Sequence, residues 1–307
     1  LFRSSDTAAA IGKFDGVHIG HRKLLEEILS KKNEGLKACV FTFDPPPAVL
    51  FGLSDGRELS TKEEKREIFE RLGVDILIEF PLTKETADIP AEEFVREYLC
   101  ERMRVRFLAA GEDVSFGRKG AGNAELLRRF SKTGISGETH STQGQPGGYE
   151  FRLIEKICVD GTEVSSTGIR SFVERGDMEQ ARKLLGEPYT VCGRVVHGNR
   201  IGRTLGFPTV NLVPTENKLL PPNGVYLSEV EFNGKVYRAI SNVGCKPTVT
   251  DERKMGVESY LYDFDEEIYG AQVSVRLLRF MRPEQKFDGV DELKAWLERD
   301  IAVGRIL

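Results

Sequence analysis

The start of the chain alternates between strand-like and helix-like patterns, and this alternation is the feature that most constrains the fold. Residues 8–14 form an apolar run that enters a turn, and residues 38–43 form a second β-rich run. The residues between these runs have the spacing of one helix face, closed by a glycine: Leu24, Leu25, Ile28, Leu29 and then Gly35. The pattern predicts a βαβ unit with two parallel strands and a right-handed crossover.

The alternation continues to about residue 185. It predicts further helices at 62–72, 91–103, 123–131 and 165–175, and further strands at 75–80, 105–110 and 150–159. Pro90 stands before the second of these helices, where proline is favoured. We therefore expect residues 1–185 to form an α/β domain with a doubly wound parallel sheet.

The chain changes character near residue 186. Short β-rich runs follow at 189–196, 208–212, 224–232, 235–243, 256–262 and 271–280. Asn233 and Gly234 form a hairpin-turn dipeptide between two of them. A helix is expected at 290–300, with Leu293, Trp296 and Leu297 on one face. Residues 186–307 are therefore predicted to form a small antiparallel β-barrel domain with a C-terminal helix.

Composition excludes several classes of protein. The net charge of -4 argues against bulk nucleic-acid binding, which usually needs a basic excess. No apolar run approaches the roughly 20 residues of a membrane span, and no signal peptide is recognisable. The 5 cysteines form no C-x-x-C pair, which is typical of reduced thiols. We therefore expect a cytoplasmic protein with neither nucleic acid nor membrane as partner; the sequence does not predict the oligomeric state.

The loop after the first strand reads GKFDGVHIGH and has the composition of a phosphate-binding loop. Gly12 and Gly16 allow a tight turn and close approach of a ligand. His18, Gly20 and His21 stand where the first helix begins, and a helix N-terminus attracts phosphate. The two imidazoles can donate hydrogen bonds to phosphoryl oxygens as charge develops, and the glycine leaves room for the phosphate.

Two other interpretations of these histidines are weaker. They could be surface or capping residues, but 2 of the 4 histidines lying three apart in one glycine-rich loop favours a shared function. They could bind zinc, but structural zinc needs about four ligands, and no Cys or Asp cluster with suitable spacing is nearby.

Two later segments fit the same pocket. Residues 165–170, SSTGIR, place hydroxyl groups at a helix start and an arginine one turn later, which suits phosphate; the alternative is an ordinary helix N-cap. Residues 111–117, GEDVSFG, follow a strand at the carboxyl edge, where ligands of α/β sheets bind; the alternative is an ordinary acidic turn.

A second group of polar residues lies in the β-rich half. Residues 193–211 read GRVVHGNRIGRTLGFPTVN, a flexible basic loop followed by a strand. Thr209 and Asn211 are two apart and point to one face, where they can complete a magnesium shell beside nucleotide phosphates. The alternative is a glycine hairpin before a polar-faced strand. This half has no G-x-x-x-x-G-K-[ST] loop.

Glu258 is a single carboxylate in the run GVESYLY. Among hydroxylic and apolar neighbours it could act as a general base toward a substrate hydroxyl. The alternative is an exposed strand position, which is the commoner environment of a glutamate.

The motifs together carry a family resemblance. GKFDGVHIGH, FTFDPPP, GEDVSFGRKGAG and VSSTGIR, in this order, resemble the adenylyltransferase half of the prokaryotic bifunctional FAD synthetases, in the H-x-G-H nucleotidyltransferase superfamily with its Rossmann-like fold. GRVVHGNRIGRTLGFPTVN, PPNGVYLSEV, SNVGCKPTV, VESYLYDFDEEIYG and MRPEQKFDGVDELKAWLERD resemble the riboflavin kinase β-barrel of the same family. The two resemblances cover nearly the entire chain.

The resemblance implies two activities and their residues. The kinase half would transfer the γ-phosphoryl group of ATP to riboflavin, with Glu258 as base, Thr209 and Asn211 positioning Mg²⁺ and ATP, and Arg282 near the flavin. The phosphates would be covered by the loop residues Gly198, Gly202, Arg203 and Gly206. The other half would join FMN to ATP, giving FAD and pyrophosphate, with Asp113 facing the flavin. Its ATP would contact Gly12, Phe14, Asp15, His18, Gly20, His21, Ser166, Thr167 and Arg170.

Other functions remain as alternatives. A nucleotidyltransferase with another acceptor would not need the attached barrel. A flavin- or nucleotide-sensing protein is expected to have lost the catalytic groups. This chain keeps all of them, which weakens that alternative: His18, His21, Thr209, Asn211 and Glu258. A nucleic-acid-binding barrel would be expected to interleave aromatic and basic residues. This chain lacks that pattern, and its net charge of -4 also weakens the alternative.

Overall fold

A computed structural model describes residues 5–133, 148–197, 207–247 and 253–306. Its contacts divide the chain into two compact units, which we call the sheet unit and the barrel unit. The sheet unit comprises Leu1–Gly56 and Lys62–Val164, and the barrel unit comprises Arg57–Thr61 and Ser165–Leu307. The functional boundary expected between residues 185 and 186 stays a prediction.

The sheet unit contains a parallel sheet of 5 strands in the order β3-β2-β1-β4-β5. The strands are β1 (Thr7–Ile11), β2 (Lys37–Asp44), β3 (Ile76–Pro81), β4 (Val105–Gly111) and β5 (Glu150–Ile154). The main helices are α1 (Ile19–Ser30), α3 (Lys62–Leu72), α5 (Ala91–Glu93) with its π-helical continuation η2 (Phe94–Arg102), and α6 (Ala124–Thr133). Shorter helical turns are η1 (Lys31–Glu34), α2 (Pro47–Leu50), α4 (Lys84–Ala87) and η3 (Arg118–Gly120). The predicted doubly wound α/β fold is confirmed.

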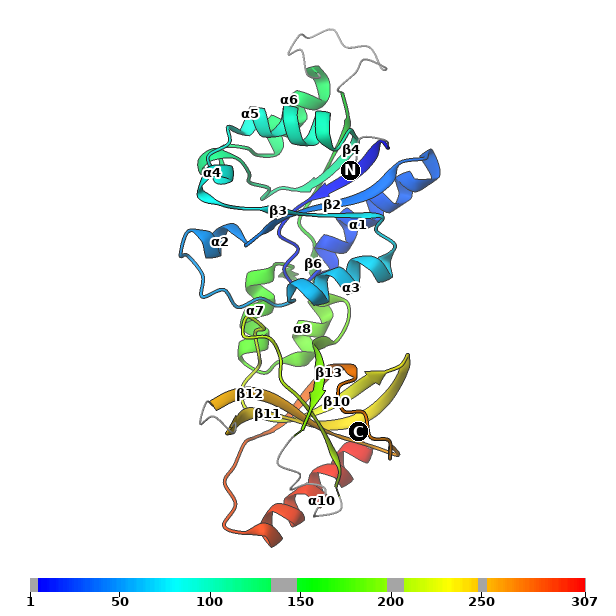
Figure 1. Cartoon of the computed structure of the whole chain (residues 1–307), viewed down its shortest axis with the longest axis vertical. Helices are drawn as coiled ribbons and strands as arrows, with labels where there is room; N and C mark the ends of the chain where they lie inside the picture. The colour runs from blue at the N-terminus through cyan, green and yellow to red at the C-terminus, as the bar shows by residue number, and fades with distance from the viewer. Residues whose placement is uncertain (1–4, 134–147, 198–206, 248–252, 307) are drawn as a thin grey trace. The chain divides into compact units, whose positions relative to one another are not determined.

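The two faces of this sheet bury different helices, as Figure 1 shows. Ala8 and Ala10 of β1 belong to the core beneath α1 and α3, while Ala9 and Ile11 belong to the core beneath η2 and α6. Alternate residues of a strand point to opposite faces, so both faces of β1 must be apolar. The three consecutive alanines have no exposed surface, and their small side chains let helices on both sides pack close to the strand.

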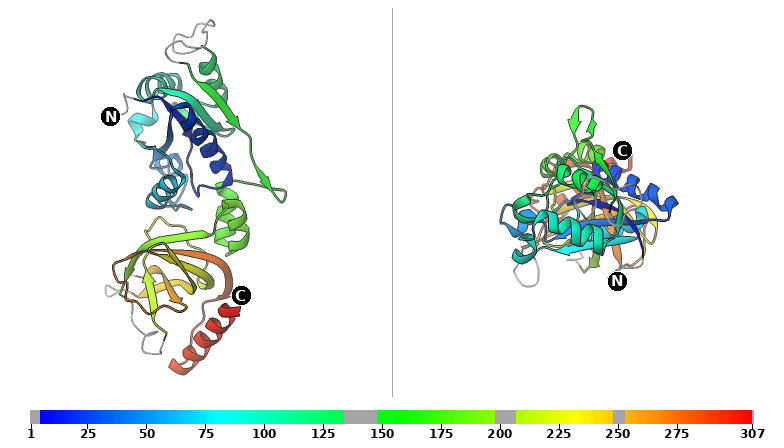
Figure 2. Two further views of the ribbon diagram at one scale, coloured as in Figure 1. Left: turned by 90° about the vertical axis from the view of Figure 1, so that its right-hand side faces the viewer. Right: turned by 90° about the horizontal axis from the view of Figure 1, so that it is seen from above.

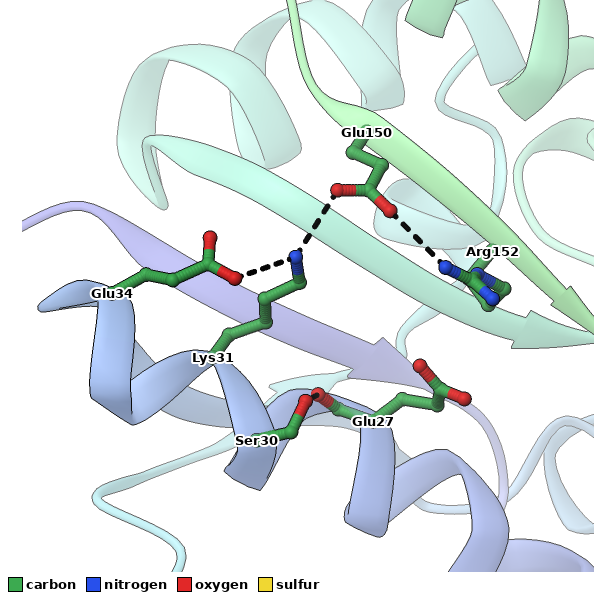
Figure 3. Close-up of polar contacts among 6 residues, drawn as sticks. All are labelled: Glu27, Ser30, Lys31, Glu34, Glu150 and Arg152. Atoms are coloured by element: carbon green, nitrogen blue, oxygen red, sulfur yellow. Dashed lines mark hydrogen bonds and ion pairs between the residues drawn. The ribbon is translucent and has the colours of Figure 1, made fainter.

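The end of α1 is connected to the edge of the sheet by an ion-pair chain (Figure 3). Nζ of Lys31 lies 2.8 Å from Oε1 of Glu34 and 3.2 Å from Oε2 of Glu150, and the other oxygen of Glu150 lies 3.4 Å from Arg152. Most of these groups are exposed, so each pair stabilises the fold by at most about 1 kcal/mol. Gly35 follows with φ of 83°, the left-handed conformation that ends the helical segment as predicted.

The strand predicted over residues 150–159 is wrong in its second half. β5 ends at Ile154, and β6 (Cys158–Val159) pairs instead with β7 (Thr162–Glu163) in a separate hairpin. The turn between them is Asp160-Gly161, with φ of 50° and 77°. Asp-Gly is a strong hairpin-turn signal because both residues tolerate positive φ. The turn pairs Cys158–Val159 with Thr162–Glu163, so these residues do not continue β5.

The barrel unit contains a closed barrel of strands in the order β10-β11-β12-β9-β8-β13. The strands are β8 (Tyr189–Val196), β9 (Thr209–Leu212), β10 (Gly224–Phe232), β11 (Lys235–Pro247), β12 (Arg253–Leu261) and β13 (Gln272–Pro283). All of its neighbouring strands are antiparallel, and β10 closes the barrel by pairing with β13, which confirms the predicted architecture. Asn233 and Gly234 join β10 to β11 with φ of 49° and 74°, the type I′ signature.

Two helices before the barrel and one distant segment also belong to this unit. The predicted α7 (Ser166–Glu174) is followed by α8 (Met178–Leu185), which the sequence interpretation missed although Asp177 caps it and Gly186 ends it. Residues 57–61 add a short parallel bridge at Lys218. There the buried ammonium of Lys218 donates a 2.7 Å hydrogen bond to the carbonyl of Leu59.

The C-terminal helix α10 (Val290–Ile306) extends beyond the predicted residues 290–300 and packs on the outside of the barrel (Figure 2). The hydroxyl of Tyr262 donates to the carbonyl of Ile301 at 2.6 Å, and Arg282 binds Asp300 through two guanidinium nitrogens. Gly304 faces the barrel where a Cβ atom would lie 2.3 Å from Cδ1 of Ile240 and 2.6 Å from the Tyr262 hydroxyl.

Gly304→Val is therefore expected to destabilise the barrel unit by about 1–3 kcal/mol, because the added methyl groups must displace Ile240 or lift the helix. The measurement is urea unfolding followed by the fluorescence of Trp296. Gly289→Ala is the matched control, since a Cβ at residue 289 meets no atom within 4 Å. Equal midpoints for the two variants would contradict the prediction.

Candidate functional site

The predicted phosphate loop, residues 12–21, follows β1 at the topological switch point of the parallel sheet. Ile11, the last residue of β1, pairs with Phe41 on one side and with Ala110 on the other. The chain leaves β1 for a helix on one face and leaves β4 for a helix on the opposite face. The loops after β1 and β4 therefore meet at the carboxyl edge, at the switch point where open α/β sheets bind ligands.

The loop has an unusual backbone that is held by a buried ring. Phe14, Gly16 and Val17 all have positive φ, of 52°, 83° and 40°. For a β-branched residue such as Val17 this conformation costs roughly 1–3 kcal/mol, a strain that is concentrated at functional sites. The Phe14 ring has no exposed surface and packs edge-on against Phe69 of α3, 5.5 Å away. A Cβ at Gly12 would lie 3.2 Å from this ring, so glycine fits here.

The structure brings the two histidines together. Their rings stack with centroids 3.6 Å apart and planes 15° apart. Nδ1 of His18 accepts a 3.3 Å hydrogen bond from the backbone N–H of His21, so His18 is the N-cap of α1. A neutral His18 must then carry its proton on Nε2, where it can donate to a ligand. A Cβ at Gly20 would lie 3.2 Å from the His18 ring, so this glycine also makes room for the stack.

Burial keeps both imidazoles uncharged. It lowers the pKa of His18 to about 4, although the carboxylates of Asp15 and Asp113 act in the opposite direction. It also lowers the pKa of His21 well below its usual value, and the charges of His18 and Lys65 lower it further. Near neutral pH the pair therefore offers hydrogen-bond donors rather than positive charge. Nδ1 of His21 is buried and meets no hydrogen-bond partner within the described part of the chain.

These two histidines should make the folded protein sensitive to acid. Because the pKa of His18 is about 4 when folded and about 6.5 when unfolded, the unfolded chain binds more protons between these values. The unfolding free energy should therefore fall as pH decreases from 6.5 toward 4, by about 2 kcal/mol at pH 5 for this residue. Urea titrations of wild type and His18→Gln at pH 7 and 5 check this. A wild-type loss no larger than that of the variant would contradict it.

The structure relates some of the residues predicted to act with the two histidines to His18, and it leaves the role of the others as a prediction. The charges of Asp15 and Asp113 act on His18, which indicates that the loops after β1 and β4 lie near each other. Ser166, Thr167 and Arg170 lie in α7 of the barrel unit, where Ser165 caps the helix by accepting a 3.2 Å bond from the Gly168 N–H. The capping alternative is thus present at residue 165, and a role of residues 166, 167 and 170 at the phosphates stays a prediction.

The second group of residues comes together on the outer face of the barrel. Asn211 of β9 pairs with Glu258 of β12, and Thr209 pairs with Tyr260. The Thr209 hydroxyl donates a 2.5 Å hydrogen bond to Oε1 of Glu258. Alternation puts these side chains on the face opposite the buried Ser259, so the predicted common face of Thr209 and Asn211 is confirmed.

A pocket of about 250 Å³ opens beside Thr209 and Asn211, and Glu258 is not among the residues that line it. Thr209 and Asn211 line it together with the loop residues 264–269, which include three consecutive carboxylates, Asp265 to Glu267. Hydroxyl, amide and carboxylate oxygens are the donors that Mg²⁺ prefers, so the predicted metal residues fit the ion. The predicted phosphate cover, Gly198, Gly202, Arg203 and Gly206, lies outside the described residues.

Arg282 has a structural partner on the same unit. Its guanidinium forms a two-point ion pair with Asp300, as close as 2.6 Å, and lies over the ring of Trp296. Because Asp300 is only 5 % exposed, this pair anchors α10 to β13. Its predicted place near the flavin stays a prediction.

Comparison with known proteins relates both sites to one family. A family model for FAD synthetase matches residues 3–168, and one for riboflavin kinase matches residues 185–307. A bifunctional riboflavin kinase/FMN adenylyltransferase of Listeria monocytogenes is 36% identical over 296 residues, covering 95% of this chain and 89% of the relative. The Escherichia coli protein of the same name is 35% identical over 298 residues, covering 96% and 90%. The chain belongs to the bifunctional riboflavin kinase/FMN adenylyltransferase family.

One solved structure has the same fold as this chain over nearly the whole length of both chains. It is a crystal structure described as a macrolide-efflux protein from Streptococcus pneumoniae, 31% identical, with a TM-score of 0.82 over 98% of this chain and 94% of that one. Among the described residues, no helix combines the length and apolar character needed to cross a membrane.

The sequence analysis did not single out Lys65, a charged residue that acts on His21 of the predicted phosphate loop. Lys65 belongs to the polar helix sequence KEEKREIFERL, yet it is only 8 % exposed. The available signal was its spacing, because Lys65 stands one turn before the buried Phe69 and therefore on the apolar face.

Proposed function

We propose that this chain makes FAD from riboflavin in two ATP-dependent steps. The barrel unit phosphorylates riboflavin to FMN, and the sheet unit transfers the adenylyl group of ATP to FMN and releases pyrophosphate. The observation that supports the proposal is that the candidate residues of each step come together within one unit: His18 stacks on His21 in the sheet unit, and Thr209 bonds to Glu258 in the barrel unit. Because both steps consume ATP, which is made in the cytoplasm, we place the enzyme there.

For the kinase step, Glu258 is the general base. Its carboxylate accepts the proton of the ribityl hydroxyl as that oxygen attacks the γ-phosphorus of ATP, the bond from that phosphorus to the bridging oxygen breaks, and ADP leaves. The hydrogen bond from Thr209 fixes the orientation of this carboxylate through Oε1. Oxygens of Thr209 and Asn211 would hold Mg²⁺, which when bound neutralises part of the phosphate charge.

For the adenylyl transfer, binding and charge stabilisation suffice. The phosphate of FMN is already anionic, so it attacks the α-phosphorus without a strong base, and pyrophosphate leaves. His18 donates from Nε2, and His21 donates from whichever ring nitrogen faces the ligand. The N-terminus of α1, which has no acidic residue in its first turn, adds favourable potential.

The test is direct. The protein is incubated with riboflavin, ATP and Mg²⁺, and the flavins are separated over time. FMN should appear first and FAD second; with FMN supplied in place of riboflavin, FAD should form without delay. Removal of the metal with EDTA should stop both steps. If neither FMN nor FAD forms, the proposal is wrong.

A further inference from the structure

Strand β2 contains a buried hydroxyl that the proposed mechanism has not used. Thr42 is 5 % exposed and lies in the segment FTFDPPP, where its neighbours Phe41 and Phe43 pack into the core on one face of the sheet. Alternation places Thr42 on the other face, together with Val40. Valine has the same branched shape and no polar group to desolvate, so the bond that the hydroxyl makes distinguishes threonine at this position.

The hydroxyl of Thr42 contacts the predicted phosphate loop directly. It donates a 3.3 Å hydrogen bond to the backbone carbonyl of Lys13, and the N–H of Gly12 donates a 3.1 Å bond to the carbonyl of Phe41. The last pair between β1 and β2 joins Ile11 to Phe41, so Thr42 is level with the point where the chain leaves the sheet. The two bonds attach the first two residues of the loop to β2.

The next part of the loop depends on this attachment because its backbone is strained. Phe14 and Val17 have φ of 52° and 40°, conformations that such residues keep only when the surrounding structure enforces them. The N–H of Val17 donates a 3.2 Å bond to the carbonyl of Phe14, which closes a turn just before His18. A displacement of the Lys13 carbonyl therefore changes where this turn places the stacked rings of His18 and His21.

We propose that Thr42 is a positioning residue for adenylyl transfer, whose hydroxyl holds the loop in the conformation that directs the two imidazoles at the phosphates. This inference rests on the proposed function of the sheet unit. Hydrogen-bond donors lower the barrier only while they stay aligned with the charge that develops, so a loop that relaxes loses rate in the chemical step. Because such an interaction acts mainly in the transition state, its loss lowers kcat more than it raises KM for ATP.

The test compares two substitutions of Thr42 in the full chain. Thr42→Val keeps the branched shape and removes the hydroxyl, whereas Thr42→Ser keeps the hydroxyl. Thr7→Val is the matched control, because Thr7 is 1 % exposed and its hydroxyl donates a 2.8 Å bond to the carbonyl of Met103. Thr7 begins β1, so it lies at the end of that strand opposite to the loop.

The steady-state kinetics of FAD formation from FMN are measured with varied ATP. We expect T42V to lose at least about tenfold in kcat, with KM for ATP within about threefold of wild type. T42S and T7V should keep kcat within about threefold of wild type. Formation of FMN by the barrel unit should be unchanged in all three variants.

Hydrogen exchange in the unliganded protein gives a second measurement that needs no turnover. The backbone N–H groups of Gly12 and Val17 belong to a loop that opens locally, so they should exchange at least about threefold faster in T42V than in wild type. They should exchange at the wild-type rate in T42S and T7V. Unchanged exchange in T42V, or an equal rise in T7V, would overturn the proposal.

The kinetic outcomes are equally decisive. A wild-type kcat in T42V, or a loss in T42S or T7V as large as that in T42V, would also overturn the proposal. If T42V does not fold, Thr42→Ala replaces it, because alanine and serine differ only by the hydroxyl: a lower kcat in T42A than in T42S supports the proposal, and equal values overturn it. If wild type forms no FAD, the proposed function fails by itself, and the exchange of Gly12 and Val17 still shows whether Thr42 holds the loop.

Discussion

His21→Ala is expected to stop FAD formation while FMN still accumulates from riboflavin. The imidazole stacks on His18 at the start of α1 and supplies a hydrogen-bond donor where charge develops on the phosphates. Loss of one such donor typically costs 10²- to 10³-fold in kcat, or roughly 3–4 kcal/mol. The measurement is the rate of FAD formation from supplied FMN and ATP, with riboflavin phosphorylation assayed in parallel.

The parallel assay makes this result specific. The barrel unit has its own strands and its own Thr209–Glu258 pair, so it should continue to make FMN at the wild-type rate. Lys23→Ala is the matched control on α1, because Lys23 is exposed and pairs only locally with Glu26 in the contacts described. If His21→Ala removed FMN and FAD formation equally, the assignment of the two steps to two sites would be wrong.

Glu258→Gln is expected to have the opposite effect. The amide keeps the size of the side chain and can still accept the Thr209 hydrogen bond, but it cannot take a proton from riboflavin. Loss of a general base costs about 10²- to 10⁴-fold, so FMN formation should nearly cease. FAD formation from supplied FMN should be unchanged, since the sheet unit does not contain this residue.

The control for this variant is Glu231→Gln on β10, a partly exposed carboxylate that pairs with Arg276. It removes the same charge from the same barrel and should leave both rates unchanged. Full kinase activity in Glu258→Gln would exclude the carboxylate as base. A wild-type urea midpoint for the same variant would show that any lost activity reflects chemistry and not unfolding.

Local patterns allowed much of the fold to be predicted. The helix over 62–72 and the strands over 189–196 and 224–232 have the predicted bounds. The Asn233-Gly234 turn also has the predicted conformation. These features depend on side-chain periodicity and on φ preferences of single residues, which neighbouring residues encode. The separate hairpin at Cys158–Glu163 was missed, although its Asp-Gly signal was present.

The sequence by itself determined the alternating α/β half, the β-rich half, and the residue types at both sites. Only the tertiary structure decided which of these residues meet. It stacked His18 on His21, bonded Thr209 to Glu258 and placed Arg57–Thr61 with the barrel. It also buried Lys65 near the histidines. The reason is physical: periodicity is local, whereas burial, electrostatics and strand register depend on segments that are distant in sequence.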